Sequence, residues 1–262
     1  MKRRNFVAAA AASSLAIVGA SKSMSNPMGN IAAEDQQLIE WRTYTLTGGG
    51  KKNLLDKYLK DALIPALNRQ KIEHIGVFTD ISRAEPLKIH VFIPHVDAAS
   101  YANMTESLAQ DDSYQKASED FHKIGPNSPV FSRYETSLIL GFKAMPRLVA
   151  PSSKKKIYEL RTYESYSDDA ARRKIDMFDR HEVKLFDDLG FEAVFYGKML
   201  AGKYMPCLTY MVCFDSMEDM EKYWDKFRTA EGWAAIKDLP EYANSVSKIH
   251  KNFLEPTSYS QI

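Results

Sequence analysis

The chain has 262 residues, of which 45% are hydrophobic and 26% are charged, and its formal net charge is +1. These values are typical of a globular protein with one large or two ordinary domains. The balanced charge, without a long run of one sign in the folded part, argues against a nucleic-acid or anionic-membrane surface.

The first segment resembles an export signal. Arg3 and Arg4 precede an apolar run, Phe6–Ala20, which ends in small residues, and a twin arginine before such a run is typical of bacterial twin-arginine export. The alternative is a membrane anchor, but a helix needs about 20 apolar residues to span a bilayer. We therefore expect residues 1–20 to be a removed signal peptide and residues 21–36 a flexible leader. The mature protein would be periplasmic or secreted, with no stable membrane anchor.

Two segments 119 residues apart share one pattern. LIEWRTYTL begins at Leu38 and IYELRTYES begins at Ile157, and both contain Glu, Arg, Thr and Tyr at matching positions. Their alternation of apolar and polar residues predicts two β-strands. The mature chain is therefore predicted to consist of two repeats of one structural unit.

The alternation also divides the second strand into two faces. Tyr158, Leu160 and Thr162 share one face, whereas a carboxylate, a guanidinium and a phenol share the other (Glu159, Arg161 and Tyr163). We expect the apolar face to pack on helices and the charged face to line the lumen of a barrel. The alternative is a solvated face with an internal Glu–Arg pair, because an antiparallel sheet can leave one face wet.

The remaining periodicity gives the same element order in both halves. Residues 37–144 alternate between strand-like and helical patterns in the order β-α-β-β-α-β, and residues 157–262 repeat it after a Pro- and Ser-containing linker, residues 145–156. Pro65 should kink or end the first helix. The fold class is therefore α+β, with two tandem ferredoxin-like repeats that close their bare sheet faces into an α/β barrel. Closure within one chain and closure between chains are both allowed, and we expect a homo-oligomer.

The first helix of the second half is predicted to run from Ser167 or Asp168 to about Leu189. Its apolar stripe comprises Ile175, Phe178, Leu185 and Leu189. At 100° per residue, His181 lies at the boundary of the buried face, and Glu182 lies nearer its centre.

Several motifs together resemble the NIPSNAP family. They are IYELRTYES, the helix exit Gly190-Phe191, GKYMPCLTYMVCFDS and EGWAAI. The resemblance is stronger across residues 157–254 than across residues 39–142. It implies the dimeric α/β-barrel type of ferredoxin-like fold and a binding or signalling role, but no established reaction. Relatives of this barrel type include haem-degrading and cofactor-free monooxygenases, isomerases and haem peroxidases, which is an analogy of fold alone.

The charged faces supply the candidate site residues. A buried arginine can hold a carboxylate or phosphate through two hydrogen bonds, so the predicted ligand-binding residues are the arginines and tyrosines of both strands (Arg42, Tyr44, Arg161 and Tyr163). Glu159 and His181 are the acid–base candidates, and His181 is also a candidate haem ligand. The alternatives are a structural ion-pair network for the strand residues and a packing role for His181. The histidines lack metal-ligand spacing, so no metal is predicted. No cofactor is predicted either, with haem as the alternative.

The sequence therefore predicts an exported NIPSNAP-like protein that binds a small acidic or oxygen-rich molecule in the barrel lumen. Acid–base or monooxygenase-like chemistry would accompany binding if the protein is an enzyme, which the sequence does not decide. The alternative is a non-catalytic interaction module whose barrel is filled with side chains.

Overall fold

The computed structural model describes residues 36–262, apart from residues 47, 49 and 50. The predicted signal peptide and nearly all of the predicted leader lie outside these residues. Within the described part, no helix has the length and apolar character needed to cross a membrane.

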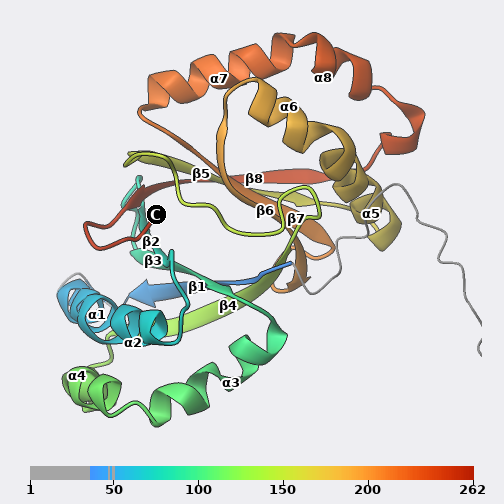
Figure 1. The fold of residues 1–262 in the computed structure, drawn as a ribbon. Helices are drawn as coiled ribbons and strands as arrows, with labels where there is room; N and C mark the ends of the chain where they lie inside the picture. Colours follow the sequence, from blue (N-terminus) through green and yellow to red (C-terminus); the bar gives the residue numbers. More distant parts are fainter. Residues whose placement is uncertain (1–35, 47, 49–50) are drawn as a thin grey trace, which may run out of the picture. The chain divides into compact units, whose positions relative to one another are not determined.

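The first half follows the predicted order of elements (Figure 1). Its strands are β1 (Leu38–Leu46), β2 (Gly76–Asp80), β3 (Lys88–His95) and β4 (Phe131–Gly141). One helical run comprises α1 (Lys52–Tyr58), the π-helical turn η3 (Leu59–Leu63) and α2 (Ile64–Arg69). Two further helices, α3 (Ala98–Ala109) and α4 (Asp112–His122), connect β3 to β4.

The second half repeats this order. Its strands are β5 (Ile157–Glu164), β6 (Glu192–Ala201), β7 (Cys207–Phe214) and β8 (Lys248–Pro256). The matching helical run comprises α5 (Asp168–Met177), the π-helical turn η4 (Phe178–Glu182) and α6 (Val183–Asp188). The helices α7 (Met217–Thr229) and α8 (Glu231–Ile236) and the short 3₁₀ helix η5 (Pro240–Tyr242) precede β8.

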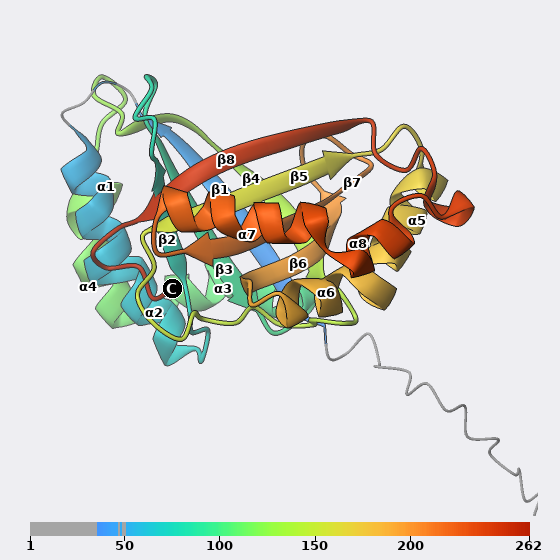
Figure 2. The same ribbon diagram turned by 90° about the horizontal axis from the view of Figure 1, so that it is seen from above.

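The eight strands form a closed barrel in the order β1-β3-β2-β8-β5-β7-β6-β4. Two seams join the halves: β2 pairs with β8, and β4 pairs with β6. One group of helices covers the first-half strands and another covers the second-half strands, as Figures 1 and 2 show. The predicted α+β fold of two ferredoxin-like repeats is therefore confirmed, with the barrel closed within one chain.

The predicted orientation of the charged face was wrong. The barrel interior holds a cluster of apolar side chains from both halves, including Ile39, Phe78, Phe92, Tyr158 and Phe195, each with an exposed fraction of 1% or less. Tyr158 and Leu160 therefore point into the lumen, and Glu159, Arg161 and Tyr163 point outward beneath the helices. Because helices cover the outside of the barrel, both faces of β5 are buried, so the polarity of a face could not identify the lumen.

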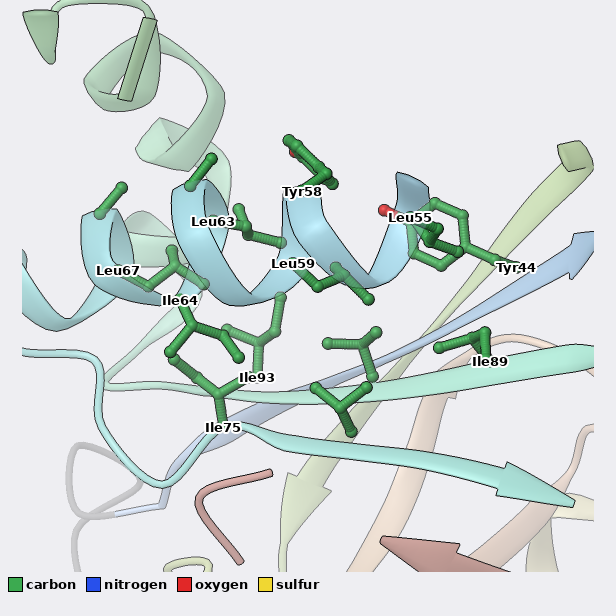
Figure 3. Close-up of a cluster of buried hydrophobic side chains, with 14 of the residues drawn as sticks. Tyr44, Leu55, Tyr58, Leu59, Leu63, Ile64, Leu67, Ile75, Ile89 and Ile93 are labelled. Atoms are coloured by element: carbon green, nitrogen blue, oxygen red, sulfur yellow. The ribbon is translucent and has the colours of Figure 1, made fainter. Parts of the chain in front are cut away.

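The first half has the same orientation. Figure 3 shows Tyr44 beside Leu55 of α1, on the helix side of the strands, together with Ile89 and Ile93 of β3. Arg42 and Glu40 alternate with the lumen-facing Ile39 and Trp41, so they share the face of Tyr44. The lumen prediction therefore fails for Arg42 and Tyr44 as well.

The π-helical turns change which side chains of each helical run face the barrel. Val183 donates its backbone N–H to the carbonyl of Phe178, five residues earlier, so η4 contains one residue more than an α-helical turn. The fully buried side chains from this turn onward are Phe178, Glu182 and Phe186, whereas Leu185 and Leu189 are half-buried and pack against the same core. In the first half, the matching turn precedes Pro65, and the helical run continues through that proline instead of ending there.

Candidate functional site

The outward face of β5 carries a row of three hydrogen-bonded side chains. Arg161 donates from Nε to Oε1 of Glu159 over 2.7 Å and from Nη1 to the hydroxyl of Tyr163 over 3.4 Å. These residues are two apart in sequence, so the pleat of the strand places them side by side. The hydroxyls of Tyr163 and Tyr210, on the neighbouring strand β7, are 2.9 Å apart. We call Glu159, Arg161 and Tyr163 the second-half row.

Trp224 of α7 packs over this row and contacts both Glu159 and Arg161. Its indole Nε1–H donates to Oε2 of Glu159 over 2.6 Å, and the centre of the Arg161 guanidinium lies 3.4 Å from the centroid of the indole ring. Both carboxylate oxygens of Glu159 therefore have a donor. This environment makes Glu159 a positioning residue that fixes Arg161, and it does not suit the acid–base role predicted for it.

The surroundings favour the protonated forms of Arg161 and Tyr163. Burial alone would lower the pKa of Arg161, but Tyr210, Tyr163 and Glu159 more than offset this effect and raise it. Burial raises the pKa of Tyr163, although the charge of Arg161 opposes the shift. The row therefore contains a protonated guanidinium and a protonated phenol, and the guanidinium N–H groups not bonded to Glu159 or Tyr163 can act as donors.

A second ion pair lies beside the row. Lys174 of α5 donates to Oε1 of Glu182 in η4, and the exposed fractions of the two residues are 5% and 2%. The Lys174 ammonium also lies 5.0 Å from the ring centroid of Phe178 and 5.7 Å from that of Trp233. Burial raises the pKa of Glu182, opposed by the charge of Lys174. We call Lys174 and Glu182 the buried pair.

The π-helical turn brings the buried pair together. Eight residues of an α-helix rotate by about 800°, which leaves two side chains about 80° apart. One extra residue in the turn makes the interval equivalent to seven residues, or about two complete turns. Lys174 and Glu182 therefore lie on the same side of the helical run.

The row and the buried pair meet at a pocket of about 320 Å³ between the outer face of the barrel and its helices. We call it the helix-side pocket. It is lined by Arg161, Tyr163, Lys174, Glu182, Phe186, Trp224, Phe227, Arg228, Trp233, Val246, Ile249 and Lys251. Arg228 and Lys251 are exposed at its edge. The lining therefore contains four cationic side chains, one carboxylate and two indoles.

The first half repeats the row without the buried pair. Arg42 donates from Nε to Oε1 of Glu40 over 2.8 Å and from Nη1 to the hydroxyl of Tyr44 over 3.2 Å. Oε2 of Glu40 lies 3.3 Å from Nε2 of His95. Burial favours a higher pKa for Glu40, but His95 and Arg42 outweigh it and hold the pKa below its ordinary value.

The helices above the two rows differ. At the same spacing of 119 residues, Leu55 stands where Lys174 lies and Leu63 stands where Glu182 lies. Both leucines are almost completely buried. Trp224 corresponds to Thr105, which is exposed in α3. The buried pair and Trp224 are therefore specific to the second half.

The structure brings together some of the predicted site residues and separates others. Arg161, Tyr163 and Glu159 are contiguous, whereas Arg42 and Tyr44 belong to a separate row under the other helical layer. His181 is half-buried, its ring centroid lies 5.9 Å from that of Tyr242, and it is not among the residues that line the helix-side pocket.

Sequence reasoning did not single out Lys174, Glu182, Trp224 or Trp233 as site residues. A signal was nevertheless present, since aligning the halves at the spacing of the two strands places lysine and glutamate opposite two leucines. Charged residues on the buried stripe of a helix are rare unless they are paired.

The donor set of the pocket does not fit a haem iron. None of the described residues that line it is histidine, cysteine or methionine, and His181 packs against Tyr242. The one lining phenol, on Tyr163, is hydrogen-bonded to Arg161 and Tyr210. Across residues 36–262, with the three omitted positions excepted, no group of three or more His, Cys, Asp or Glu side chains could hold a metal ion. We therefore derive no step through a metal or haem.

Comparison with known proteins gives a family match and a set of structural neighbours. The NIPSNAP family model matches residues 158–261, less than half of the chain, and this segment contains the whole helix-side pocket. No curated protein matches the sequence.

Three solved structures resemble the fold over most of its length. A candidate monooxygenase from Fusobacterium nucleatum gives a TM-score of 0.57 at 9% identity, over 84% of this chain and 92% of that chain. A candidate monooxygenase from Lactobacillus acidophilus gives 0.55 at 9% identity, over 84% of this chain and 94% of that chain. An anthrone oxidase-like protein gives 0.51 at 14% identity, over 87% of this chain and 94% of that chain. The chain therefore has the α/β-barrel fold of these proteins, with a NIPSNAP match in the half that contains the pocket.

Proposed function

We propose that this chain is a NIPSNAP-like protein that binds a small planar organic acid in the helix-side pocket of its second half. The observation that carries the proposal is the composition of that pocket, in which buried cations and indole rings line one space. A volume of about 320 Å³ lies at the lower end of the range for small-molecule sites.

The charges favour an anionic ligand. Arg161 and Lys174 are buried, and Arg228 and Lys251 stand at the pocket edge, against a single lining carboxylate on Glu182. A guanidinium held in place by Glu159 and Trp224 offers its remaining N–H groups at little entropic cost. Exposed Arg228 and Lys251 would raise the local concentration of an anion at the entrance.

The aromatic side chains favour a flat, unsaturated body. Trp224, Trp233 and Phe227 line the pocket, and the ring centroids of Phe227 and Trp233 are 4.8 Å apart. Aromatic side chains pack on a planar ring in offset or edge-to-face arrangements, with centroids about 4.5–7 Å apart. Together with the cations, they suit an aromatic carboxylate better than an aliphatic one.

The structural neighbours support a role with small molecules, because two are named as candidate monooxygenases and one as anthrone oxidase-like. A fold alone does not determine a reaction. In this pocket, Glu182 is better suited than Glu159 to move a proton, because both oxygens of Glu159 are hydrogen-bonded to fixed donors.

Calorimetric titration of the purified protein tests the proposal with four probes of similar size. Benzoate and 2-naphthoate are expected to bind, whereas benzyl alcohol and benzamidine, which lack the carboxylate, are expected to bind at least tenfold more weakly, a difference of about 1.4 kcal/mol. The proposal is wrong if neither carboxylate binds, or if benzamidine binds as well as benzoate.

The second candidate function is a non-catalytic interaction module, and the filled barrel interior favours it. Aromatic and aliphatic side chains from both halves occupy the interior, which was predicted to be the ligand chamber. Failure of all four probes, together with saturable binding of a protein partner, would favour this function.

Export and self-association remain separate proposals. Arg3 and Arg4, followed by an apolar run, support twin-arginine export to the periplasm. Cell fractionation of the wild type and an Arg3→Lys/Arg4→Lys variant tests this, since the variant should accumulate unexported.

Because the barrel closes within one chain, a homo-oligomer would have to use another surface, and native mass spectrometry would report both subunit number and any retained small molecule.

A further inference from the structure

The buried pair is not needed to build the helical run. The first half forms the same π-helical turn at the matching position, with Leu55 and Leu63 in place of Lys174 and Glu182. A buried ion pair is often no more stabilising than apolar side chains of similar volume, because both ions lose their hydration. The pair in the second half therefore calls for an explanation other than folding.

The buried groups around the pocket are close to charge balance before a ligand enters. Arg161 is matched by Glu159, and Lys174 is matched by Glu182. An anion that binds beside these buried groups adds one negative charge that they do not compensate, and an unpaired buried charge is costly. Binding is favoured if one buried carboxylate becomes neutral.

We propose that Lys174 and Glu182 form an exchangeable ion pair: an entering carboxylate replaces Glu182 beside the Lys174 ammonium, and Glu182 takes up one proton from solvent. This inference rests on the proposed function, since it assumes a carboxylate in the helix-side pocket. The charge balances, because the ligand brings one negative charge and the proton removes one. Lys174 changes only its partner.

Glu182 is the carboxylate suited to this exchange. Glu159 accepts hydrogen bonds on both oxygens, from Arg161 and from Trp224. Glu182 lines the pocket, is held by the flexible side chain of Lys174, and lies where burial favours its protonated form. Loss of the Lys174 contact would raise the pKa of Glu182 further, since Lys174 is what opposes the shift.

The phenols that face Glu182 cannot take up the proton, because they already carry one. Phenols face it from β5, β6 and β7 (Tyr163, Tyr196 and Tyr210), and burial raises the pKa of each, so they stay protonated near neutral pH. The cations nearby are Lys174 on α5, Arg161 on β5, and Arg228 and Lys251 at the pocket edge. His181, the neighbouring residue in η4, also acts on Glu182 electrostatically, and it therefore needs a control.

Proton uptake by the wild-type protein is the primary test. Benzoate is titrated calorimetrically near pH 7 in two non-anionic buffers with different ionisation enthalpies, such as bis-Tris and Tris, because the dependence of the observed heat on the buffer gives the protons bound. Benzoate is already ionised at this pH, so protons taken up must go to the protein. We expect about one proton per benzoate, and an affinity that weakens by up to about tenfold per pH unit as pH rises.

Each outcome decides between the two proposals. Binding of benzoate without proton uptake overturns the exchange and leaves the proposed function intact. If neither benzoate nor 2-naphthoate binds, both proposals fall.

Two variants locate the proton. Glu182→Gln keeps the shape of the side chain but cannot titrate, so it should bind benzoate with no proton uptake and with an affinity independent of pH. His181→Gln is the matched control and should retain the uptake of the wild type. Uptake that persists in Glu182→Gln, or disappears in His181→Gln, would show that the proton goes elsewhere. If Glu182→Gln does not fold, the wild-type titration combined with the His181→Gln control still decides.

Discussion

The two halves of the barrel share their strands, their row of Glu, Arg and Tyr, and even the position of a π-helical turn, yet they differ in what lies above the row. In the first half, two positions of the helical run hold the buried leucines Leu55 and Leu63. In the second half, Lys174 and Glu182 replace those leucines and line a pocket together with Trp224. The comparison teaches that the row belongs to the architecture of this barrel, whereas the helical layer determines which side chains stand over the row.

The largest expected effect comes from making the second half resemble the first. Lys174→Leu alone leaves Glu182 buried without its cation, and breaking a buried pair in this way costs about 3–5 kcal/mol of unfolding free energy. The double variant Lys174→Leu/Glu182→Leu restores the residues of the first half and should be as stable as the wild type, or up to about 4 kcal/mol more stable. Urea unfolding measures both. A double variant no more stable than the single variant would show that the pair is structural.

Removing the indole donor should have the next largest effect. Trp224→Phe keeps an aromatic ring but leaves Oε2 of buried Glu159 without its 2.6 Å hydrogen bond. An unsatisfied buried acceptor costs about 1–3 kcal/mol, and the orientation of Arg161 would also be less fixed. Trp233→Phe at the half-buried edge of the same pocket is the control, with a smaller expected loss by thermal unfolding. Equal losses in the two variants would argue against the role assigned to Trp224.

The two halves should respond to pH in opposite directions. The pKa of Glu182 is raised above its ordinary value of 4.5, so above that pH the folded chain retains a proton that the unfolded chain has lost. Its contribution to the unfolding free energy therefore falls as pH rises through the raised pKa, by about 1.4 kcal/mol for each unit of pKa shift.

The pKa of Glu40 is lowered from 4.5, so its contribution is present above that pH and is lost as pH falls through the lowered pKa. Urea unfolding of Glu182→Gln and Glu40→Gln between about pH 3 and pH 8 separates the two terms. The stability of Glu182→Gln relative to wild type should rise with pH, and that of Glu40→Gln should fall. Parallel profiles would contradict the comparison.

The smallest expected effect concerns the arginines themselves. Arg161→Lys keeps the charge but loses the planar fork and the stacking on Trp224, so benzoate should bind about fivefold more weakly, a loss of about 1 kcal/mol. Arg42→Lys is the same substitution in the first-half row and should leave benzoate affinity unchanged. Calorimetry on the two variants distinguishes them, and an equal loss in both would mean that ligand binding is not confined to the second half.

The sequence predicted the element order well, because the first strand of each half alternates and the two halves repeat the same order of elements. It could not predict which face points inward. Local polarity identifies a buried face only when the other face meets water, and here Leu160 and Arg161 are both buried, one in the barrel and one under α7. Arg161 tolerates its position because Glu159 and Tyr163, two residues away on the same strand, supply its partners.

Only the strand residues of the site were predicted, and the reason is again the local pattern of the sequence. Arg161 and Tyr163 lie in a repeated motif and were therefore noticeable, whereas Lys174 and Glu182 lie on a helix whose stripe shifts by one residue at the π-helical turn. A regular 3.6-residue period places Lys174 and Glu182 about 80° apart, so their pairing cannot be seen unless that turn is known. Comparison of the two halves residue by residue would have been the better guide.

The seams between β2 and β8 and between β4 and β6 also bear on how such a protein can evolve. In a barrel assembled from two copies of one polypeptide, every substitution enters both copies, so a charge introduced for binding on one side is also imposed on the other. Here both seams join segments of a single polypeptide. One copy of the ancestral unit can therefore keep its leucines and supply stability, while the other gives up part of that stability to acquire charged groups and specialise.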